Sequence, residues 1–187
     1  MTEPQFEHLR AWWRLRFEDV MAPAPETLPP FREVNHRINI INIDARHVER
    51  RPTCPQALEG QLREKLARYE RAGWWVQRPV PHACPLLCIA KKDGSLRTVI
   101  DAHQHNSNTI LDVTPMPDMW AIMDNMARKT YCSKIDMTDV YEQIRIEPEC
   151  IKFSGFSTPY GMFESNVMQQ GDCNAPSTFQ HVLTWVF

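Results

Sequence analysis

No run of apolar residues in the sequence is long enough to cross a membrane, and the first residues, Met1–Glu7, carry acidic side chains where a secretion signal would carry apolar ones. The sequence also has no Cys-x-x-Cys pair, and its six cysteines are scattered too sparsely for a disulfide framework. We therefore expect an intracellular protein, in the cytoplasm or the nucleus, that is not secreted and has no membrane partner.

A large net charge is missing as well. The formal net charge at pH 7 is −2, which argues against a uniformly basic coat for nucleic acid. Charge is uneven along the chain, because residues 32–110 hold 13 Lys and Arg against 8 Asp and Glu, and residues 111–187 hold 5 against 10. The first stretch could face phosphate and the second a metal ion, although ordinary surface variation also produces such differences.

Repeating apolar patterns predict an α+β protein, and the 43% of hydrophobic residues is enough for one large core or two small ones. Helical spacing predicts helices over residues 4–20, 53–73, 118–127 and 175–187. Alternating or β-branched runs predict strands over 34–43 and 131–135, and β-hairpins over 85–101 and 153–168. Prolines over residues 22–30 predict a linker.

Local signals predict where these helices begin and end and which faces they bury. Thr53 and Gln56 read as a capping box, Gly73 as a left-handed C-cap and Asn174 as an N-cap. The helix over 118–127 is expected to turn four apolar side chains inward: Met119, Ile122, Met123 and Met126. The helix over 53–73 is expected to carry its basic side chains on a solvated face: Arg63, Lys65, Arg68 and Arg71.

Two features suggest chemistry. Lys91 and Lys92 lie at the turn of the first predicted hairpin and Arg97 on its returning strand, and cations on a stiff ribbon suit a polyphosphate. Lysines also protect ordinary edge strands, which is the structural alternative. Asp136 ends an apolar run just before a polar turn, where a rigid carboxylate can hold a divalent cation. An ordinary turn aspartate is the simpler reading of Asp136 taken alone.

The order of the motifs is more specific than any one of them. The chain reads Lys91-Lys-Asp-Gly-Ser-Leu-Arg97, then Ser133-Lys-Ile-Asp-Met-Thr-Asp-Val-Tyr-Glu-Gln-Ile144, then Gln170-Gly-Asp-Cys-Asn-Ala-Pro-Ser-Thr-Phe-Gln180. In this order the segments resemble the reverse transcriptases of gypsy-like LTR retrotransposons, and residues 167–176 resemble the fungal branch. The resemblance covers residues 31–187, while residues 1–30 resemble the helix and proline-rich linker ahead of the polymerase.

The resemblance implies an α+β fold of the right-hand polymerase type, with fingers and a partial palm, in which an antiparallel sheet carries Asp136 and helices pack on it. It also implies an RNA-directed DNA polymerase that uses Mg²⁺ and binds an RNA or DNA template–primer and a deoxynucleoside triphosphate. Asp136 matches the metal-binding aspartate of a two-metal mechanism, in which the ions activate the primer 3′-hydroxyl and stabilise the leaving pyrophosphate.

Further residues match positions with known roles in that family. Lys91 and Arg97 match the fingers residues that clamp the triphosphate, and Asp139 would offer it a backbone amide. Tyr141 matches the residue that stacks under the incoming sugar and excludes a ribose 2′-hydroxyl, and Gln170 matches the glutamine that contacts the nucleotide 3′-hydroxyl. The segment that supports the template strand would include Gly171, Pro176, Phe179 and Gln180.

The sequence departs from the family pattern in three places. It contains no aromatic-x-Asp-Asp element, so we expect the lone Asp136 to bind Mg²⁺ weakly and this chain, as a truncated or decaying copy, to be inactive by itself. The usual Asp-x-Arg reads Asp101-Ala-His103, with His103 expected to be an ordinary loop residue. The usual Lys-Thr-Ala-Phe reads Phe153-Ser-Gly-Phe156.

Other functions stay open at this point. The basic fingers could serve a non-catalytic nucleic-acid-binding remnant or an interaction module. A zinc-dependent module could use His82, Cys84 and Cys88, but a second ligand pair at zinc-finger spacing is lacking. The palm strands missing from the sequence would leave an unpaired edge and uncovered apolar surface, so we expect aggregation, a homo-oligomer or contact with downstream polymerase subdomains.

Overall fold

A five-stranded sheet forms the centre of the computed structural model, which describes residues 2–45, 50–115, 117–132 and 136–186. The strand order is β1-β5-β4-β2-β3, and only the β2–β4 pair is parallel. The sheet is therefore mixed, although three of its four strand pairs are antiparallel, as predicted. The strands are β1 (Trp75–Gln77), β2 (Cys84–Ala90), β3 (Leu96–Ile100), β4 (Phe156–Thr158) and β5 (Gly161–Ser165).

Both predicted hairpins are confirmed. Strands β2 and β3 pair antiparallel from Leu86 opposite Ile100 to Ala90 opposite Leu96. Their turn is closed by a hydrogen bond from the Lys91 amide to the Ser95 carbonyl (2.8 Å), and Gly94 takes the positive φ of 78° that such a turn needs. Strands β4 and β5 form the second hairpin over residues 156–165, which is shorter than the predicted 153–168, and Phe153 is the last residue of a 3₁₀ turn (Pro148–Phe153).

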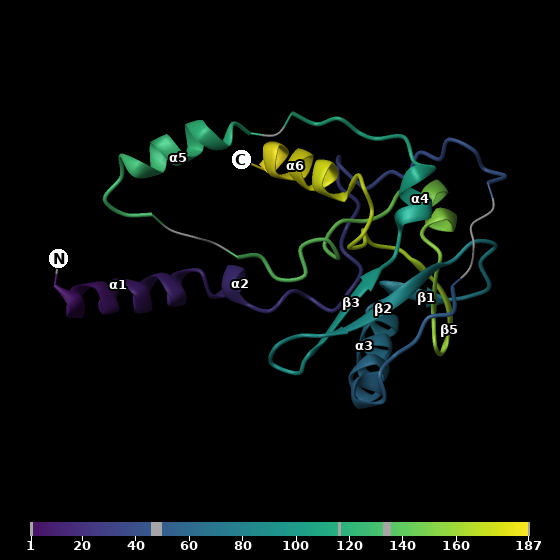
Figure 1. Ribbon diagram of the computed structural model, residues 1–187. Helices are drawn as coiled ribbons and strands as arrows, with labels where there is room; N and C mark the ends of the chain where they lie inside the picture. The colour runs from purple at the N-terminus through teal and green to yellow at the C-terminus, as the bar shows by residue number, and fades with distance from the viewer. Residues whose placement is uncertain (1, 46–49, 116, 133–135, 187) are drawn as a thin grey trace.

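Helix α3 (Glu59–Arg71) packs beneath the sheet and supplies much of the core (Figure 1). Leu62, Leu66 and Tyr69 are buried against Trp75 and Phe156, as their spacing predicted. Full burial of one such leucine stabilises the fold by about 1.5–3 kcal/mol. Gly73 follows the helix with φ 71°, which confirms the predicted left-handed position.

The predicted capping box at the start of this helix is wrong. Pro55 has an extended ψ of 137°, so a 3₁₀ turn (Gln56–Leu58) precedes α3 and no side chain caps either element. The predicted N-cap at Asn174 also has a different role. The Asn174 side-chain oxygen accepts from the Asp112 amide (2.9 Å), and its side-chain amide donates to the Ile110 carbonyl (2.8 Å). Asn174 therefore ties residues 110–112 to the start of α6 (Ala175–Val186).

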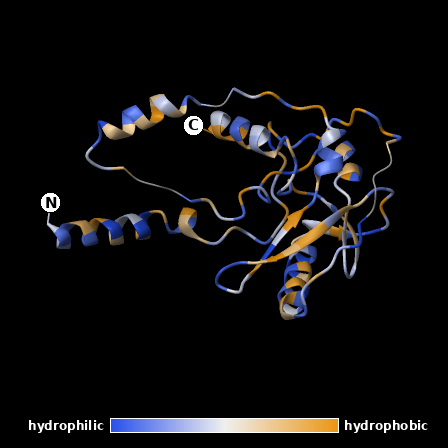
Figure 2. Ribbon diagram, viewed as in Figure 1, coloured by the Kyte–Doolittle hydropathy of each residue, from blue (hydrophilic) through white to orange (hydrophobic). Residues whose placement is uncertain are grey.

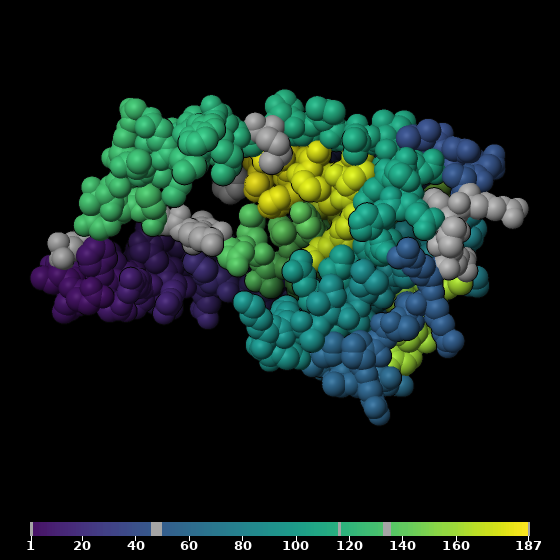
Figure 3. Space-filling model, viewed as in Figure 1, coloured from purple at the N-terminus to yellow at the C-terminus, as the bar shows by residue number. Residues whose placement is uncertain are grey.

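Two helices extend away from the sheet, at the left of Figures 1 and 3. Helix α1 (Glu3–Arg16) is continued by the short α2 (Glu18–Met21), and α5 (Met119–Ala127) lies above them. Figure 2 shows apolar positions on both α1 and α5. The inward packing predicted for α5 is wrong because no described element covers it, and its four apolar side chains are 40–64% exposed. They are Met119, Ile122, Met123 and Met126.

The strand predicted over residues 34–43 is also wrong, although this segment is anchored firmly. It makes only isolated bridges, one of them between His36 and Ile146, because no neighbouring chain runs beside it for several residues. Upstream, the Trp74 indole donates to the Thr27 carbonyl (2.8 Å) and the Arg32 guanidinium to the Gln143 carbonyl (2.6 Å). Residues 26–36 thus form a strap along the sheet and the 139–147 segment.

The strand predicted to end at Asp136 falls on residues that the structure does not describe. Residues 133–135 lie outside the described residues, while Tyr131, Cys132 and Asp136 are exposed and have no strand pairing. Within the described ranges, every helix is too short or too polar to traverse a lipid bilayer.

Candidate functional site

A cavity of about 340 Å³ opens between α3, the β2–β3 hairpin and two loops. The loops are the 139–142 turn and the 168–170 segment, which approach the hairpin from the C-terminal half of the chain. The residues that line it are Lys65, Tyr69, Trp75, Leu86, Lys91, Leu96, Arg97, Thr98, Ile100, Asp139, Glu142, Met168, Gln169 and Gln170. Polar and charged side chains dominate this lining, so the cavity suits a charged ligand better than an apolar one.

Four residues singled out from the sequence meet in this cavity. Lys91 and Arg97 come from the hairpin, Asp139 from the turn and Gln170 from the loop that precedes α6. They lie up to 79 positions apart in the sequence and are brought together by the fold. Asp136 does not line the cavity.

Lys65 is a cavity residue that the sequence analysis assigned to a solvated face. Its ammonium group donates to the Thr98 hydroxyl on β3 (2.7 Å) and lies 4.8 Å from the centre of the Tyr69 ring. Burial lowers the pKa of Lys65, even though the negative charges of Glu142 and Asp139 act in the opposite direction. Lys65 and Tyr69 are four residues apart on one helix, and this spacing is the only sequence signal that could have paired them.

The cavity floor carries a tyrosine–carboxylate pair. The Tyr69 hydroxyl donates to Glu142 Oε1 at 3.0 Å. Burial, with the nearby charges of Glu142 and Asp139, raises the pKa of Tyr69, so the phenol stays neutral and keeps donating. Glu142 is thereby held in place beside Lys65.

The turn that carries Asp139 is strained and braced. Asp139 has a positive φ of 47°, which aspartate tolerates better than most residues. Arg68 reaches it from α3 with a 2.8 Å ion pair and makes a second 2.8 Å ion pair with Glu26 of the strap. Burial opposes the charged form of Arg68, but the hydrogen bond and charge of Asp139 raise its pKa. Arg68 therefore links the strap to Asp139 and helps to fix the position of the Asp139 turn.

Gly171 lets the chain pass close to β3. It has φ 122°, and a Cβ atom there would lie 2.6 Å from the Ile100 carbonyl oxygen. The Gly171 carbonyl accepts from the Asn106 side-chain amide at 2.8 Å. Next to this tight approach, Gln169 is 6% exposed, and its Nε2 atom has no hydrogen-bond partner within the described chain.

The remaining predicted residues lie beyond the cavity. Tyr141 packs edge-on against Phe179 of α6, with ring centres 6.1 Å apart, above a small cluster that includes Met168. Gln180, one position further along α6, donates to the Thr184 hydroxyl (3.4 Å). Pro176 is exposed in the first turn of the same helix. These residues therefore lie on α6 or against it, outside the cavity lining.

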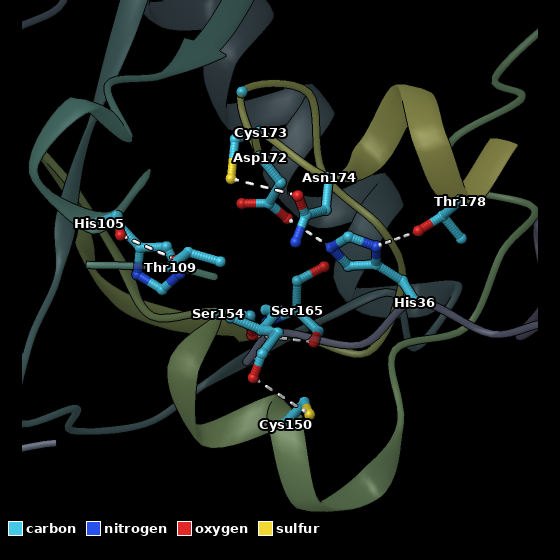
Figure 4. Close-up of polar contacts among 12 residues, drawn as sticks. His36, His105, Thr109, Cys150, Ser154, Ser165, Asp172, Cys173, Asn174 and Thr178 are labelled. Atoms are coloured by element: carbon cyan, nitrogen blue, oxygen red, sulfur yellow. Dashed lines mark hydrogen bonds and ion pairs between the residues drawn. The ribbon is translucent and has the colours of Figure 1, made fainter. Parts of the chain in front are cut away.

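A buried histidine network holds the loop between Gln170 and α6 (Figure 4). His36 is 1% exposed and lies between Asp172 (Nε2 to Oδ2, 3.3 Å) and the Thr178 hydroxyl (Nδ1 to Oγ1, 2.9 Å). The strap is thus fastened to the Gln170–Asn174 loop at one end and to the Asp139 turn at the other. No motif in the sequence points to this role of His36.

The Asp101-Ala-His103 departure forms a surface ion pair. His103, the first residue of the short helix α4 (His103–Ser107), is 95% exposed and its Nδ1 contacts Asp101 Oδ1. Arg50 lies 3.9 Å from the other Asp101 oxygen. The hydrogen bond from His103 lowers the pKa of Asp101.

The described residues do not provide a complete set of ligands for a metal ion. Asp136 is exposed and offers carboxylate oxygens, the donors that Mg²⁺ prefers. Across the ranges that the structure describes, no three His, Cys, Asp or Glu side chains are grouped so that they could hold a metal ion. The cavity lining includes the cations Lys65, Lys91 and Arg97 beside the carboxylates of Asp139 and Glu142, and such cations can contact an anionic ligand without a metal.

The sequence matches one protein family and several known proteins. Residues 89–187 match the family described as "Reverse transcriptase (RNA-dependent DNA polymerase)". The chain is 24% identical over 172 residues to the Transposon Tf2-3 and Tf2-7 polyproteins of Schizosaccharomyces pombe (strain 972 / ATCC 24843), a match that covers 91% of this chain. It spans only 13% of the length of those polyproteins.

Solved structures of similar fold are protease–reverse transcriptases of foamy virus. The one in complex with an RNA/DNA hybrid superposes with a TM-score of 0.80 and 16% identity, over 100% of this chain and 25% of that chain. Another, in complex with double-stranded DNA, gives 0.64 and 21%, over 82% of this chain and 28% of that chain. The predicted α+β fold with fingers and a partial palm is confirmed at the level of fold.

Proposed function

Because the chain belongs to the reverse transcriptase (RNA-dependent DNA polymerase) family, we propose that it forms the fingers and the first part of the palm of an RNA-directed DNA polymerase encoded in an LTR retrotransposon polyprotein. The reaction of the complete enzyme is nucleotidyl transfer from a deoxynucleoside triphosphate to a primer. The observation that carries this proposal is the cavity that unites Lys91, Arg97, Asp139 and Gln170.

The cavity residues have separate roles in the proposal. Lys91 and Arg97 bind the triphosphate, Arg97 through a forked pair of hydrogen bonds and Lys91 as a point charge. The amide of Asp139 donates to the same phosphates, and Gln170 contacts the 3′-hydroxyl of the nucleotide. Tyr141, which lies beside the cavity and not in its lining, stacks under the sugar and excludes a ribose 2′-hydroxyl, supported by Phe179 behind it.

These roles suit the chemistry of phosphoryl transfer. The reaction needs in-line placement of the attacking and leaving oxygens and compensation of negative charge, and it needs no protein nucleophile. Cations held on a stiff hairpin provide placement at low reorganisation cost. The template strand would run over the surface that holds Gly171, Pro176, Phe179 and Gln180.

Mg²⁺ is the proposed cofactor of the complete enzyme, with Asp136 as one ligand. When bound, the ions neutralise charge on the reacting phosphates. The described residues hold no complete ligand group, so the proposal assigns only Asp136 as a ligand within them. The 187 residues by themselves are therefore proposed to be inactive in DNA synthesis.

A second candidate function is nucleic-acid binding without catalysis. The basic cavity does not depend on a metal site, and this observation favours a retained binding module as the alternative.

In both cases the proposed partners are an RNA or DNA template–primer and a nucleotide, and the proposed location is inside the cell. A second copy of the chain or the downstream polymerase subdomains would cover the exposed face of α5.

Nucleotide binding tests the proposal most simply. We expect the purified chain to bind a fluorescent deoxynucleoside triphosphate, and the changes Lys91→Gln and Arg97→Gln each to weaken binding about ten-fold or more, the worth of a charge-assisted hydrogen bond. Lys92→Gln is the matched control, since Lys92 has the same charge one residue away but does not line the cavity. Equal losses for all three variants would show a diffuse charge effect and contradict the proposed site.

Primer extension and salt-dependent binding separate the two candidate functions. The chain is expected to make no DNA on an RNA–DNA template–primer in Mg²⁺. Mg²⁺-dependent synthesis that Asp136→Asn abolishes would refute the inactivity and support catalysis by this chain. Template–primer binding that weakens steeply with salt and needs Lys91 and Arg97 but not Asp136 would favour the binding module.

A further inference from the structure

Lys65 is a cation in the cavity to which the proposed function gives no role. An ammonium group has three donors, and the Thr98 hydroxyl uses one of them. The Tyr69 and Trp75 rings lie 4.8 Å and 5.8 Å from the nitrogen and provide only weak cation–π contacts. Lys65 thus has two N–H groups left, and it lines the same cavity as Lys91 and Arg97.

The charges around Lys65 leave it incompletely neutralised. In the described parts of the chain, no carboxylate oxygen lies within the 4.0 Å of an ion pair from its nitrogen. Glu142 and Asp139 face it from the 139–142 turn, and Arg68 and Lys91 face it with like charge from α3 and the hairpin. Glu142 already accepts from Tyr69, and Asp139 pairs with Arg68. The nearest anions are therefore engaged elsewhere.

We propose that Lys65 is a third phosphate-binding cation of this cavity and contacts the triphosphate together with Lys91 and Arg97. The proposal rests on the proposed function, because it assigns one more residue to the same ligand. Lys65 comes from α3, whereas Lys91 and Arg97 come from the β2–β3 hairpin. A contact from this second element would fix the orientation of the bound triphosphate and also increase the affinity of the protein for it.

This assignment predicts a coupling between triphosphate binding and protonation. Burial lowers the pKa of free Lys65, so a fraction of the side chains is neutral at alkaline pH. A bound polyanion favours the charged form and raises the pKa again. At a pH between the pKa of Lys65 in the free protein and its pKa in the complex, binding must take up a proton from solution. A lysine that only supports the fold would show no such uptake.

Calorimetry with inorganic tripolyphosphate in metal-free buffer tests the coupling. Titrations at about pH 7 and pH 9, each in two buffers of different ionisation enthalpy, give the protons taken up per ligand. We expect uptake by the wild-type chain at pH 9 and much less at pH 7. Lys65→Gln should bind about ten-fold more weakly at pH 7 and lose the extra uptake. Lys65→Arg should keep most of the affinity without uptake, because arginine stays charged.

The controls separate this inference from the function on which it rests. Lys92→Gln should retain wild-type affinity and proton uptake, and circular dichroism checks that each variant is folded. Wild-type affinity in Lys65→Gln, or unchanged proton uptake in either Lys65 variant, would overturn the role of Lys65 while leaving that of Lys91 and Arg97. A wild-type chain that does not bind tripolyphosphate at all would overturn both proposals.

Discussion

Replacement of Gly171 by alanine should destabilise the chain more than any other glycine-to-alanine change beside the cavity. The backbone at Gly171 has φ 122°, a region that residues with a Cβ atom rarely adopt, and this conformation costs about 1–3 kcal/mol. The new Cβ would also lie 2.6 Å from the carbonyl oxygen of Ile100, a backbone atom at the end of β3 that cannot rotate away. The two contributions together suggest a loss of about 2–5 kcal/mol in the free energy of unfolding.

Gly60→Ala provides a matched control with the opposite sign. Gly60 lies within α3, and a Cβ atom there meets no other atom within 4 Å. Alanine should stabilise the helix by about 0.5–1 kcal/mol because it loses less backbone entropy on folding.

Thermal unfolding followed by circular dichroism measures both changes. For a chain of this length, 1 kcal/mol corresponds to a shift of about 2–4 °C in Tm. Gly171→Ala should therefore lower Tm by about 4–20 °C, and Gly60→Ala should raise it by about 1–4 °C. A Tm for Gly171→Ala equal to or above that of the wild type would refute the close approach of residue 171 to β3.

Other predictions concern the strap, the thiols and the sugar. Arg68→Met should lower Tm by about 2–4 °C in low salt, the worth of an exposed ion-pair network, and a difference that persists at about 1 M NaCl would contradict an ionic role. Burial raises the pKa of Cys84 to about 12, so at pH 8 about one Cys84 thiol in ten thousand is ionised. Iodoacetamide should therefore label the exposed Cys132 first, and labelling of Cys84 should increase only as the pH approaches 12. Fast labelling of Cys84 at pH 8 would disprove its burial. Tyr141→Ala should reduce the preference of the chain for deoxyribonucleotides over ribonucleotides in competition binding, with Tyr141→Phe as the control, and an unchanged preference would argue against contact with the sugar.

Local sequence signals predicted the elements whose partners are close in the chain. The β2–β3 hairpin follows from two apolar runs around Lys91–Ser95, and its pairing involves only neighbouring residues. Helix α3 follows from Leu58, Leu62, Leu66 and Tyr69, because one apolar face is enough to define it. The left-handed position of Gly73 likewise depends on its immediate neighbours.

Long-range contacts decided the features that sequence reasoning missed. Residues 34–43 have the β-branched pattern of a strand, but a strand forms only where a partner runs alongside, and here only single bridges form. Helix α5 was found from its periodicity, but periodicity does not reveal whether an element covers the apolar face. Lys65 and Arg68 read as solvated cations because their partners, Thr98 and Asp139, are 33 and 71 residues away.

In the candidate site, too, some features could be predicted from the sequence and others depended on long-range contacts. The triphosphate-binding roles of Lys91, Arg97, Asp139 and Gln170 were inferred from a resemblance of motifs, and their meeting in one cavity adds a geometric reason for them. The charged floor of that cavity, with Glu142 held by Tyr69, had no counterpart in the sequence analysis. Spacing within a helix can bring two side chains together, but it cannot show which distant loop faces them.

The central claim is that this chain binds a nucleoside triphosphate in the cavity between α3, the β2–β3 hairpin and the 139–142 turn. Backbone amide NMR of the labelled chain during titration with a deoxynucleoside triphosphate tests it most directly. Binding in this cavity should change chemical shifts at residues 91–97, 139–142 and 168–171 and leave them constant around the separate 250 Å³ pocket that His82 and Phe153 line on another part of the surface. Shifts that gather at that second pocket, or none in the first three segments at saturating nucleotide, would contradict the claim.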